Sequence, residues 1–172
     1  VRRWRVVGVA PMLTARAGSG RPAPEGWGIP METQALARAL DEANVPAAHL
    51  AGWSLGGSIA LDFAMTYPER VVTLTLVEPQ ARWVLRRLGR ETERERADTE
   101  RFRIFDRADI TEELLAAFLR MAGVAAEGED PRESRAWPLA WANRLALAGV
   151  WRVATHDDDP ARLERLGMPA LL

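Results

Sequence analysis

Apolar residues in the first half of the chain follow two patterns, which are short continuous runs and repeats every three or four positions. Three short apolar runs, at 6–10, 49–53 and 71–77, predict buried strands. Two segments between these runs, 31–44 and 55–67, repeat apolar residues every three or four positions and predict helices. Because strands and helices follow each other in turn, the pattern predicts an α/β fold, with a parallel sheet and helices on both of its faces.

Three other stretches have a different character. Glycine and proline are frequent in residues 18–30, which predicts a loop before the first helix. Arginine and glutamate dominate residues 86–103 and predict one solvated helix, with opposite charges on neighbouring turns. The last apolar residues, 168–172, predict the start of another strand.

Two further helices are predicted on either side of a polar linker. The first covers residues 109–123, with Thr111 as its N-cap and Gly123 at its C-terminal end. The second covers residues 138–149 and has an apolar stripe formed by Trp137, Trp141 and Leu145. Together with the charged helix, these segments predict a helical region between the strands at 71–77 and 168–172.

The composition of the 172 residues narrows the chemistry. The chain has no cysteine, which excludes disulfides, thiolate metal ligands and a thiol nucleophile. All 23 basic residues are arginine, so Schiff-base chemistry on a lysine is excluded as well. A net charge of −1 favours neither a nucleic acid nor an acidic membrane surface as partner. The sequence has no apolar run long enough to span a membrane and no signal-peptide pattern at its start, so we expect a cytoplasmic protein, and its oligomeric state is left open.

The residues Gly52-Trp53-Ser54-Leu55-Gly56 form a G-x-S-x-G motif between a predicted strand and a predicted helix. This is the setting of a nucleophile elbow, a turn so sharp that it forces the serine into strained backbone geometry. Small residues at Gly52 and Gly56 would let neighbouring backbone pass closely. The N–H of Leu55 would lie unpaired at the positive end of the helix, where it can stabilise an oxyanion. The motif therefore predicts Ser54 as a nucleophile and Leu55 as half of an oxyanion hole.

The wider sequence resembles the α/β-hydrolase superfamily. Residues 48–79, AHLAGWSLGGSIALDFAMTYPERVVTLTLVEP, look like its nucleophile strand, nucleophile helix and next strand. Residues 2–11, RRWRVVGVAP, resemble an earlier strand, and residues 157–172, DDDPARLERLGMPALL, resemble the approach to a later one. The resemblance implies a serine hydrolase that acts on a small molecule, an ester or related acyl substrate, through an acyl-enzyme. It also implies that no cofactor and no metal take part. It also implies three parts, which are a hydrolase core, a helical cap and a return to the core, over residues 1–80, 81–155 and 156–172.

Parts of the family pattern have no counterpart in the sequence. Members usually have earlier strands with a His-Gly turn that supplies the second oxyanion donor, and a catalytic histidine after the last strand. The family loop D-x-x-G-H-G-x-S corresponds here to residues 12–19, MLTARAGS, where only Ser19 matches. We therefore expect an incomplete α/β-hydrolase fold, an internal fragment that lacks a strand beside 49–53. The 172 residues alone are then expected to be inactive.

Neither histidine of the chain is a convincing general base for Ser54. His49 begins the strand that ends at the motif, about 16 Å from Ser54 at 3.3 Å per residue. His156 lies in the polar sequence ATHDDDP and is interpreted as a solvated loop residue, because the base of this fold usually follows the last strand.

Glu78 follows the strand at 71–77 and is a candidate for the acid that orients the base, since some superfamily members, haloalkane dehalogenases among them, place it there. The alternative is that Glu78 only lines the pocket. Asp157, Asp158 and Asp159 lack the spacing of a calcium loop and are interpreted as a solvated helix N-terminus, with Asp158 or Asp159 as the cap. The tryptophans of the helical region are expected to pack inside it rather than to line a substrate pocket, and they are Trp137, Trp141 and Trp151.

Several functions stay open at this point. Acyl transfer, C–C bond hydrolysis, haloperoxidation and dehalogenation occur on the same scaffold and are not separated from ester hydrolysis by the sequence. A different class is a non-catalytic, truncated hydrolase-fold fragment, which the missing base favours.

Overall fold

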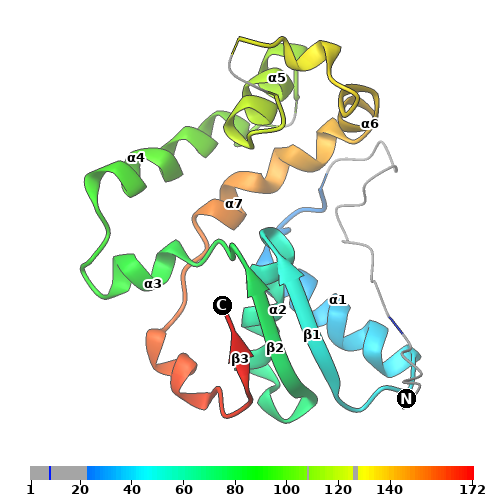
Figure 1. Ribbon diagram of the computed structural model, residues 1–172, viewed down its shortest axis with the longest axis vertical. Helices are drawn as coiled ribbons and strands as arrows, with labels where there is room; N and C mark the ends of the chain where they lie inside the picture. Colours follow the sequence, from blue (N-terminus) through cyan, green and yellow to red (C-terminus); the bar gives the residue numbers. More distant parts are fainter. Residues whose placement is uncertain (1–7, 9–22, 108, 126–127) are drawn as a thin grey trace, which may run out of the picture.

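The computed structural model describes residues 8, 23–107, 109–125 and 128–172 (Figure 1). The strand predicted over residues 6–10 and the beginning of the predicted loop over 18–30, with Ser19, lie outside these ranges, apart from Gly8.

Three parallel strands form the sheet, in the order β1-β2-β3. They are β1 (Ala48–Trp53), β2 (Val71–Val77) and β3 (Ala170–Leu171). Leu50 is paired with Leu74 and Trp53 with Val77, so β1 and β2 end at the same edge. The strands predicted at 49–53 and 71–77 and their parallel pairing are therefore confirmed. Within the described residues, no strand pairs with the other edge of β1.

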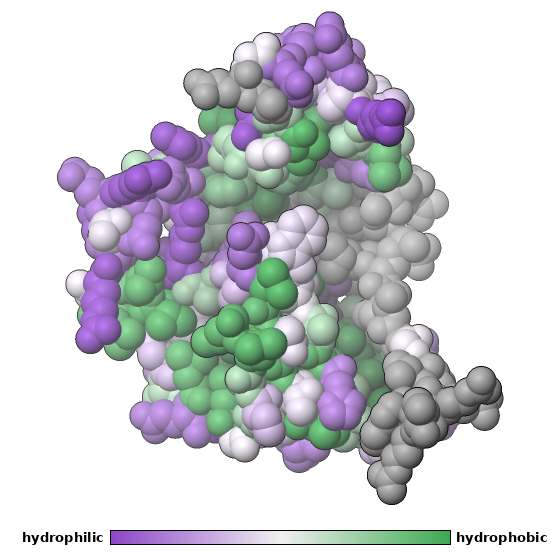
Figure 2. Space-filling view, in the orientation of Figure 1, coloured by the Kyte–Doolittle hydropathy of each residue, from purple (hydrophilic) through white to green (hydrophobic). Residues whose placement is uncertain are grey.

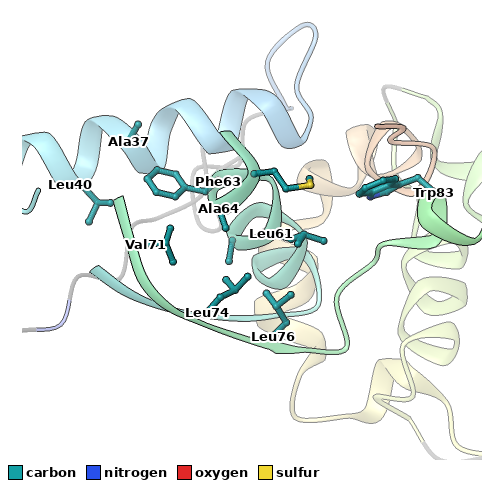
Figure 3. Close-up of a cluster of buried hydrophobic side chains, with 11 residues drawn as sticks. Ala37, Leu40, Leu61, Phe63, Ala64, Val71, Leu74, Leu76 and Trp83 are labelled. Atoms are coloured by element: carbon teal, nitrogen blue, oxygen red, sulfur yellow. The ribbon is translucent and has the colours of Figure 1, made fainter. Parts of the chain in front are cut away.

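Helix α2 (Leu55–Thr66) joins β1 to β2 and packs directly on the sheet. All of its residues from Gly57 to Met65 are buried, as expected for a helix that is apolar on every side. Figure 3 shows Phe63 and Ala64 of α2 packed over Val71 and Leu74 of β2 in the main hydrophobic cluster.

Helix α1 (Ile29–Glu42) contributes Ala37 and Leu40 to the same cluster and packs on α2 (Figure 3). It therefore lies on the same side of the sheet as α2. The predicted helix cover on both faces is not found in the described part of the chain. On the opposite face of the sheet Val77, which follows the buried Leu76 in β2, is 50% exposed.

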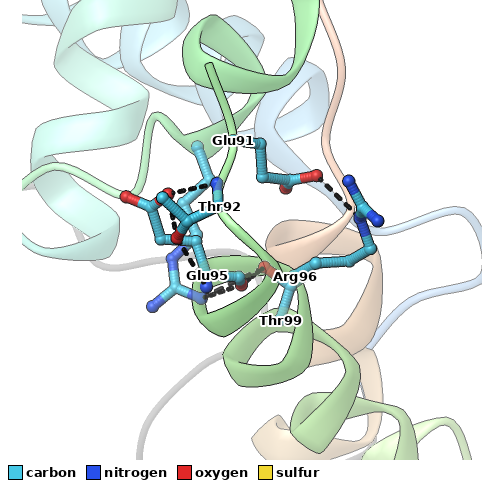
Figure 4. Close-up of polar contacts among 6 residues, drawn as sticks. Glu91, Thr92, Glu95, Arg96 and Thr99 are labelled. Carbon is cyan, nitrogen blue, oxygen red and sulfur yellow. Dashed lines mark hydrogen bonds and ion pairs between the residues drawn. The ribbon is translucent and has the colours of Figure 1, made fainter. Parts of the chain in front are cut away.

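The charged stretch predicted as one helix over 86–103 is divided, and this expectation was wrong. Helix α3 (Arg82–Arg87) ends before Gly89, which has a φ of 65° that favours glycine. Helix α4 (Glu93–Glu100) begins anew after Thr92, whose side chain accepts a hydrogen bond from the Glu95 N–H at 3.2 Å. The Glu95 carboxylate accepts from the Thr92 N–H at 2.7 Å and completes a capping box (Figure 4). These bonds lower the pKa of Glu95.

The rest of the helical region consists of short elements. They are η2 (Arg101–Phe105), α5 (Glu112–Met121), η3 (Pro131–Glu133), α6 (Trp137–Ala142), η4 (Arg144–Gly149) and α7 (Val150–Ala154). The Thr111 side chain accepts from the Leu114 N–H, which confirms the predicted N-cap of α5. The single helix predicted over 138–149 is divided at Asn143, whose side-chain amide donates to the Leu139 carbonyl at 2.7 Å.

A second hydrophobic cluster holds this region together and is separate from the one under the sheet. Its buried members are Phe105, Ile110, Leu115 and Leu119. Trp137 and Trp141 pack against this cluster and stack on each other, with ring centroids 6.0 Å apart. Their packing agrees with the structural interpretation of these two side chains. None of the helices in the described ranges has the length and apolar character needed to cross a membrane.

The chain returns to the sheet through a short 3-10 helix, η5 (Pro160–Arg165). Asp159 caps η5, because its side chain accepts from the Ala161 N–H at 2.9 Å. This confirms one of the two predicted caps. The strand predicted over 168–172 is realised as the two residues of β3.

Candidate active site

The turn between β1 and α2 places Ser54 in a backbone conformation that non-glycine residues rarely adopt. Its φ is 51° and its ψ is −119°. Such a residue costs of order 1–3 kcal/mol and persists only where the surroundings hold it. Here the Ser54 N–H donates to the Val77 carbonyl at 2.9 Å, which ties the turn to the end of β2. The strained turn that the motif predicts is therefore present.

Gly52 explains why this turn needs glycine, whereas Gly56 does not. A Cβ on Gly52 would lie 2.3 Å from the Gly56 carbonyl oxygen and 2.7 Å from the Gly57 nitrogen. A Cβ on Gly56 would meet no described atom within 4 Å. Gly57 is the second tight position, since its Cβ would lie 3.2 Å from Pro79. The expected close approach of neighbouring backbone is thus found at Gly52. The second position at which a side chain would collide is Gly57 and not Gly56.

Ser58, which the sequence analysis did not single out, links the turn to the segment that follows β2. This buried hydroxyl accepts from the Gln80 N–H at 2.9 Å and lies 3.4 Å from the Ser54 carbonyl oxygen. The only sequence signal for these contacts was the position of Ser58, one helical turn after Ser54.

The half-buried Ser54 and the Leu55 N–H lie together at the start of α2. Among the described residues, no backbone carbonyl accepts from the Leu55 N–H, and no hydrogen-bond partner is found for the Ser54 hydroxyl. The first N–H groups of a helix have no partner inside it, and the helix dipole makes this end positive. The pair can therefore offer a hydroxyl and an adjacent donor for negative charge.

Trp53 and Glu78 lie beside Ser54 at the same edge of the sheet. Trp53 is 70% exposed, and its indole N–H donates to the Glu78 carboxylate at 3.3 Å. Glu78 has a φ of 48°, so left-handed residues follow both β1 and β2. The structure therefore brings Ser54, Leu55 and Glu78 together, as the sequence predicts. The Trp53–Glu78 contact was missed, because it depends on the register of two strands.

The two histidines lie away from Ser54. His49 is at the opposite end of β1, where its Nδ1 pairs with the Thr73 hydroxyl at 2.9 Å. His156 borders a cavity of about 240 Å³ together with Asp62 of α2. Asp62 lies eight positions after Ser54 in the chain, about 12 Å along the helix axis at 1.5 Å per residue. No described histidine is therefore placed to act as the base for Ser54.

His156 lies in a loop, as predicted, and is half-buried, but its ring is not fully solvated. Its Nε2 is buried and has no hydrogen-bond partner among the described residues. The Arg86 guanidinium donates to the His156 carbonyl at 3.0 Å, which helps to hold this segment against the fold. The sequence signal for this environment was weak, because the enclosing residues come from distant parts of the chain.

The three aspartates after His156 have separate roles rather than forming one solvated terminus. Asp157 pairs with Arg87, Asp158 pairs with Arg162, and Asp159 caps η5. Burial acts to raise the pKa of Asp158, but hydrogen bonds from Arg162 and from the Asp159 N–H, with the charge of Arg162, lower it overall.

Comparison with known proteins adds independent information. A family model described as the alpha/beta hydrolase fold matches residues 18–145. A segment of 64 residues is 38% identical to the dihydrolipoyllysine-residue acetyltransferase component of the acetoin cleaving system of Cupriavidus necator, covering 36% of this chain and 17% of that protein. Another of 47 residues is 49% identical to the "Putative carbamate hydrolase RutD" of Azorhizobium caulinodans, covering 27% of this chain and 18% of that protein. A third of 49 residues is 49% identical to homoserine O-acetyltransferase of Thermus thermophilus, covering 28% of this chain and 13% of that protein.

A solved structure also aligns with the chain, a "probable hydrolytic enzyme" from Pseudomonas aeruginosa PAO1. The alignment covers 87% of this chain and 49% of that one, with 23% sequence identity and a TM-score of 0.46. Each of the three sequence matches described before this structure covers less than a fifth of the length of the relative.

Proposed function

This chain belongs to the alpha/beta hydrolase fold family, and we propose on that premise that Ser54 is the nucleophile of a hydrolase acting on an ester or related acyl substrate. The observation that carries the proposal is the strained turn at Ser54, next to the Leu55 N–H, for which no described residue supplies an acceptor. Strain of this kind is concentrated at functional sites, where the surrounding structure enforces it.

The proposed reaction proceeds in two stages. A base takes the proton of the Ser54 hydroxyl while its oxygen attacks the substrate carbonyl carbon, and the Leu55 N–H donates to the resulting oxyanion. The tetrahedral intermediate collapses, the alcohol leaves with the proton from the base, and an acyl-enzyme remains on Ser54. Water then attacks the ester carbon, the acid is released, and Ser54 regains its proton.

Two groups in this scheme are not supplied by the described residues around Ser54. One is the general base, for which the family resemblance implies a histidine. The other is the second oxyanion donor. We propose that the active protein provides both from residues other than those described, since a lone serine hydroxyl is a weak nucleophile near neutral pH.

Glu78 and Trp53 are proposed to shape the site rather than to react. Glu78 follows β2, the neighbour of the strand that leads into Ser54, and we propose that its carboxylate orients a base or lines the pocket. Its hydrogen bond from Trp53 holds the exposed indole at the mouth of the site. We propose that Trp53 forms one wall of the substrate pocket.

The helices from α3 to α7 are proposed to act as a cap over this site, within residues 81–155. Figure 1 places them beyond the edge of the sheet at which β1 and β2 end. Most of them share a hydrophobic cluster of their own, whereas Trp83 of α3 and Val153 of α7 pack into the clusters around α2. Such a region would determine which acyl and leaving groups fit.

Acyl transfer is the second candidate function. It is favoured by the similarity to homoserine O-acetyltransferase and to the acetyltransferase component of the acetoin cleaving system. The same acyl-enzyme on Ser54 would then react with an acceptor hydroxyl or thiol in place of water.

Ester hydrolysis by the full-length gene product tests the proposal. We expect Ser54→Ala to lower the rate of p-nitrophenyl acetate hydrolysis at least about 1,000-fold, while Ser134→Ala in the helical region leaves it unchanged. Faster product formation on addition of an alcohol or thiol, with the acylated acceptor recovered, would assign transfer instead. Equal activity of the wild type and Ser54→Ala would contradict both functions, and a wild type without any activity would favour the non-catalytic interpretation.

A further inference from the structure

A second polar cluster lies toward the opposite end of α2 from Ser54. Asp62 belongs to α2, whereas His156 and Asp158 belong to the segment between α7 and η5. One ligand atom from each of these three side chains lies within 4.8 Å of the other two. The cluster borders the cavity of about 240 Å³, whose polar lining also includes Thr66 and Arg162.

The His156 ring is incompletely satisfied at this position. Its Nε2 is buried, and no described residue forms a hydrogen bond with it. Leaving a buried polar atom without a partner costs about 1–3 kcal/mol, and native structures have few such atoms. One ring nitrogen of His156 is among the three clustered ligand atoms, and a neutral imidazole whose Nε2 carries the lone pair can bind a metal ion.

The two carboxylates are held as metal-binding carboxylates are, by hydrogen bonds to one oxygen each. The side chains of Asp62 and Asp158 are only 7% and 10% exposed. Asp62 Oδ2 accepts from the Thr33 hydroxyl at 2.5 Å, and Asp158 Oδ1 accepts from the Asp159 N–H at 2.7 Å. Outer hydrogen bonds of this kind orient ligands toward a metal.

The remaining oxygens already face a cation. Nη1 of Arg162 lies 3.5 Å from Asp62 Oδ1 and is hydrogen-bonded to Asp158 Oδ2. Two carboxylates and one guanidinium leave the cluster with one net negative charge, and Nε2 still lacks a partner. Arg162 has another partner in the Thr66 hydroxyl, to which its Nη2 donates at 2.7 Å. It can therefore keep a contact with α2 if its Nη1 gives way.

We propose that His156 Nε2 and the carboxylates of Asp62 and Asp158 bind a divalent transition-metal ion, with the Arg162 guanidinium as the competing cation. One imidazole and two carboxylates suit Zn²⁺, Co²⁺ or Mn²⁺. The ligand atoms would draw together until each lies about 2.0–2.2 Å from Zn²⁺. The ion would fasten the segment before η5 to α2. This site does not depend on the function proposed for Ser54.

Metal titration of the chain, purified without a histidine tag and freed of metal with EDTA, tests this site. We expect Zn²⁺ to bind in a one-to-one ratio by calorimetry and Co²⁺ to give a visible absorption band. His156→Ala should weaken Zn²⁺ binding at least tenfold. The matched control is His49→Ala, which removes the other of the two histidines and should change the affinity less than twofold. Absence of binding, or an equal loss in both variants, would overturn the proposal.

The variant Arg162→Gln separates a metal site from a purely ionic cluster. If Arg162 competes with the ion, its removal should tighten Zn²⁺ binding about tenfold, and Zn²⁺ should raise the melting temperature more than in the wild type. Circular dichroism checks that each variant is folded. A folded Arg162→Gln chain with unchanged or weaker Zn²⁺ affinity would contradict the proposed competition. It would show that Zn²⁺ and the Arg162 guanidinium do not bind the same carboxylate oxygens.

Discussion

Gly52 packs directly against the backbone of Gly56 and Gly57, next to Ser54. The Gly56 carbonyl occupies the space that a side chain at Gly52 would need, at 2.3 Å from the position of its Cβ. Because the obstructing atoms belong to the backbone at the start of α2, they cannot move without changing the turn that orients Ser54. The first glycine of the motif is thus explained by packing, and Ser54 itself carries the left-handed backbone.

We therefore predict that Gly52→Ala lowers the free energy of unfolding by about 3 kcal/mol or more, as a severe overpacking. Gly56→Ala is the matched control, since its methyl group would meet no described atom and alanine favours a helix by up to about 1 kcal/mol over glycine. Urea denaturation of the two variants measures the difference. Similar stability of the two would show that the backbone around Ser54 is less constrained than described.

At the scale of elements, one arginine provides the polar contacts between η5 and α2, beside the apolar packing of Leu163 and Leu166 on the main cluster. Arg162 contacts Asp62, Asp158 and the Thr66 hydroxyl at once. The hydrogen bond that Arg162 donates to the Asp158 carboxylate raises the pKa of Arg162, which stays positively charged. The net effect on Asp158 is a pKa below its ordinary value, although burial opposes this shift.

The sign of this shift predicts how acid affects the contact. A carboxylate whose pKa is lower in the folded state stabilises the fold above its unfolded pKa and loses that contribution as the pH falls through the folded value. With EDTA present, we expect Asp158→Asn to be less stable than the wild type at pH 7. The difference should shrink as the pH falls below about 4. Thermal unfolding between pH 7 and 2 checks this, and a difference that stays constant or grows would refute the assigned coupling.

At the scale of the whole molecule, the face of the sheet opposite α2 exposes several large apolar side chains in the described part of the chain. Figure 2 shows hydrophobic side chains gathered over the strands. Trp53, Val77 and Leu171 are 70%, 50% and 65% exposed. Patches of this kind mark contact surfaces or aggregation hazards.

Local signals predicted a large part of this fold. β1, β2, α2 and the N-cap at Thr111 follow from short-range patterns and are present as expected. The break at Gly89 was missed, because charge pattern was given more weight than a glycine followed by a capping box. Within the candidate site, Ser54 and Leu55 were identified because the motif is contiguous.

Features that depend on distant residues were not predictable. His156 meets Asp62 only because the return segment folds back on α2, and no local pattern encodes that contact. The same applies to the bond between Trp53 and Glu78, which requires the register of β1 against β2. The described helices cover only one face of the sheet because α1 packs on α2, and the sequence of α1 does not specify that contact.

The reactivity of Ser54 is the central claim, and covalent labelling of the full-length gene product tests it most directly. After treatment with a fluorophosphonate, intact mass spectrometry should show a single adduct, and peptide mapping should place it on Ser54. The adduct should disappear in Ser54→Ala and persist in Ser134→Ala. A folded, full-length protein that gains no adduct, or gains it on another residue, would contradict the account.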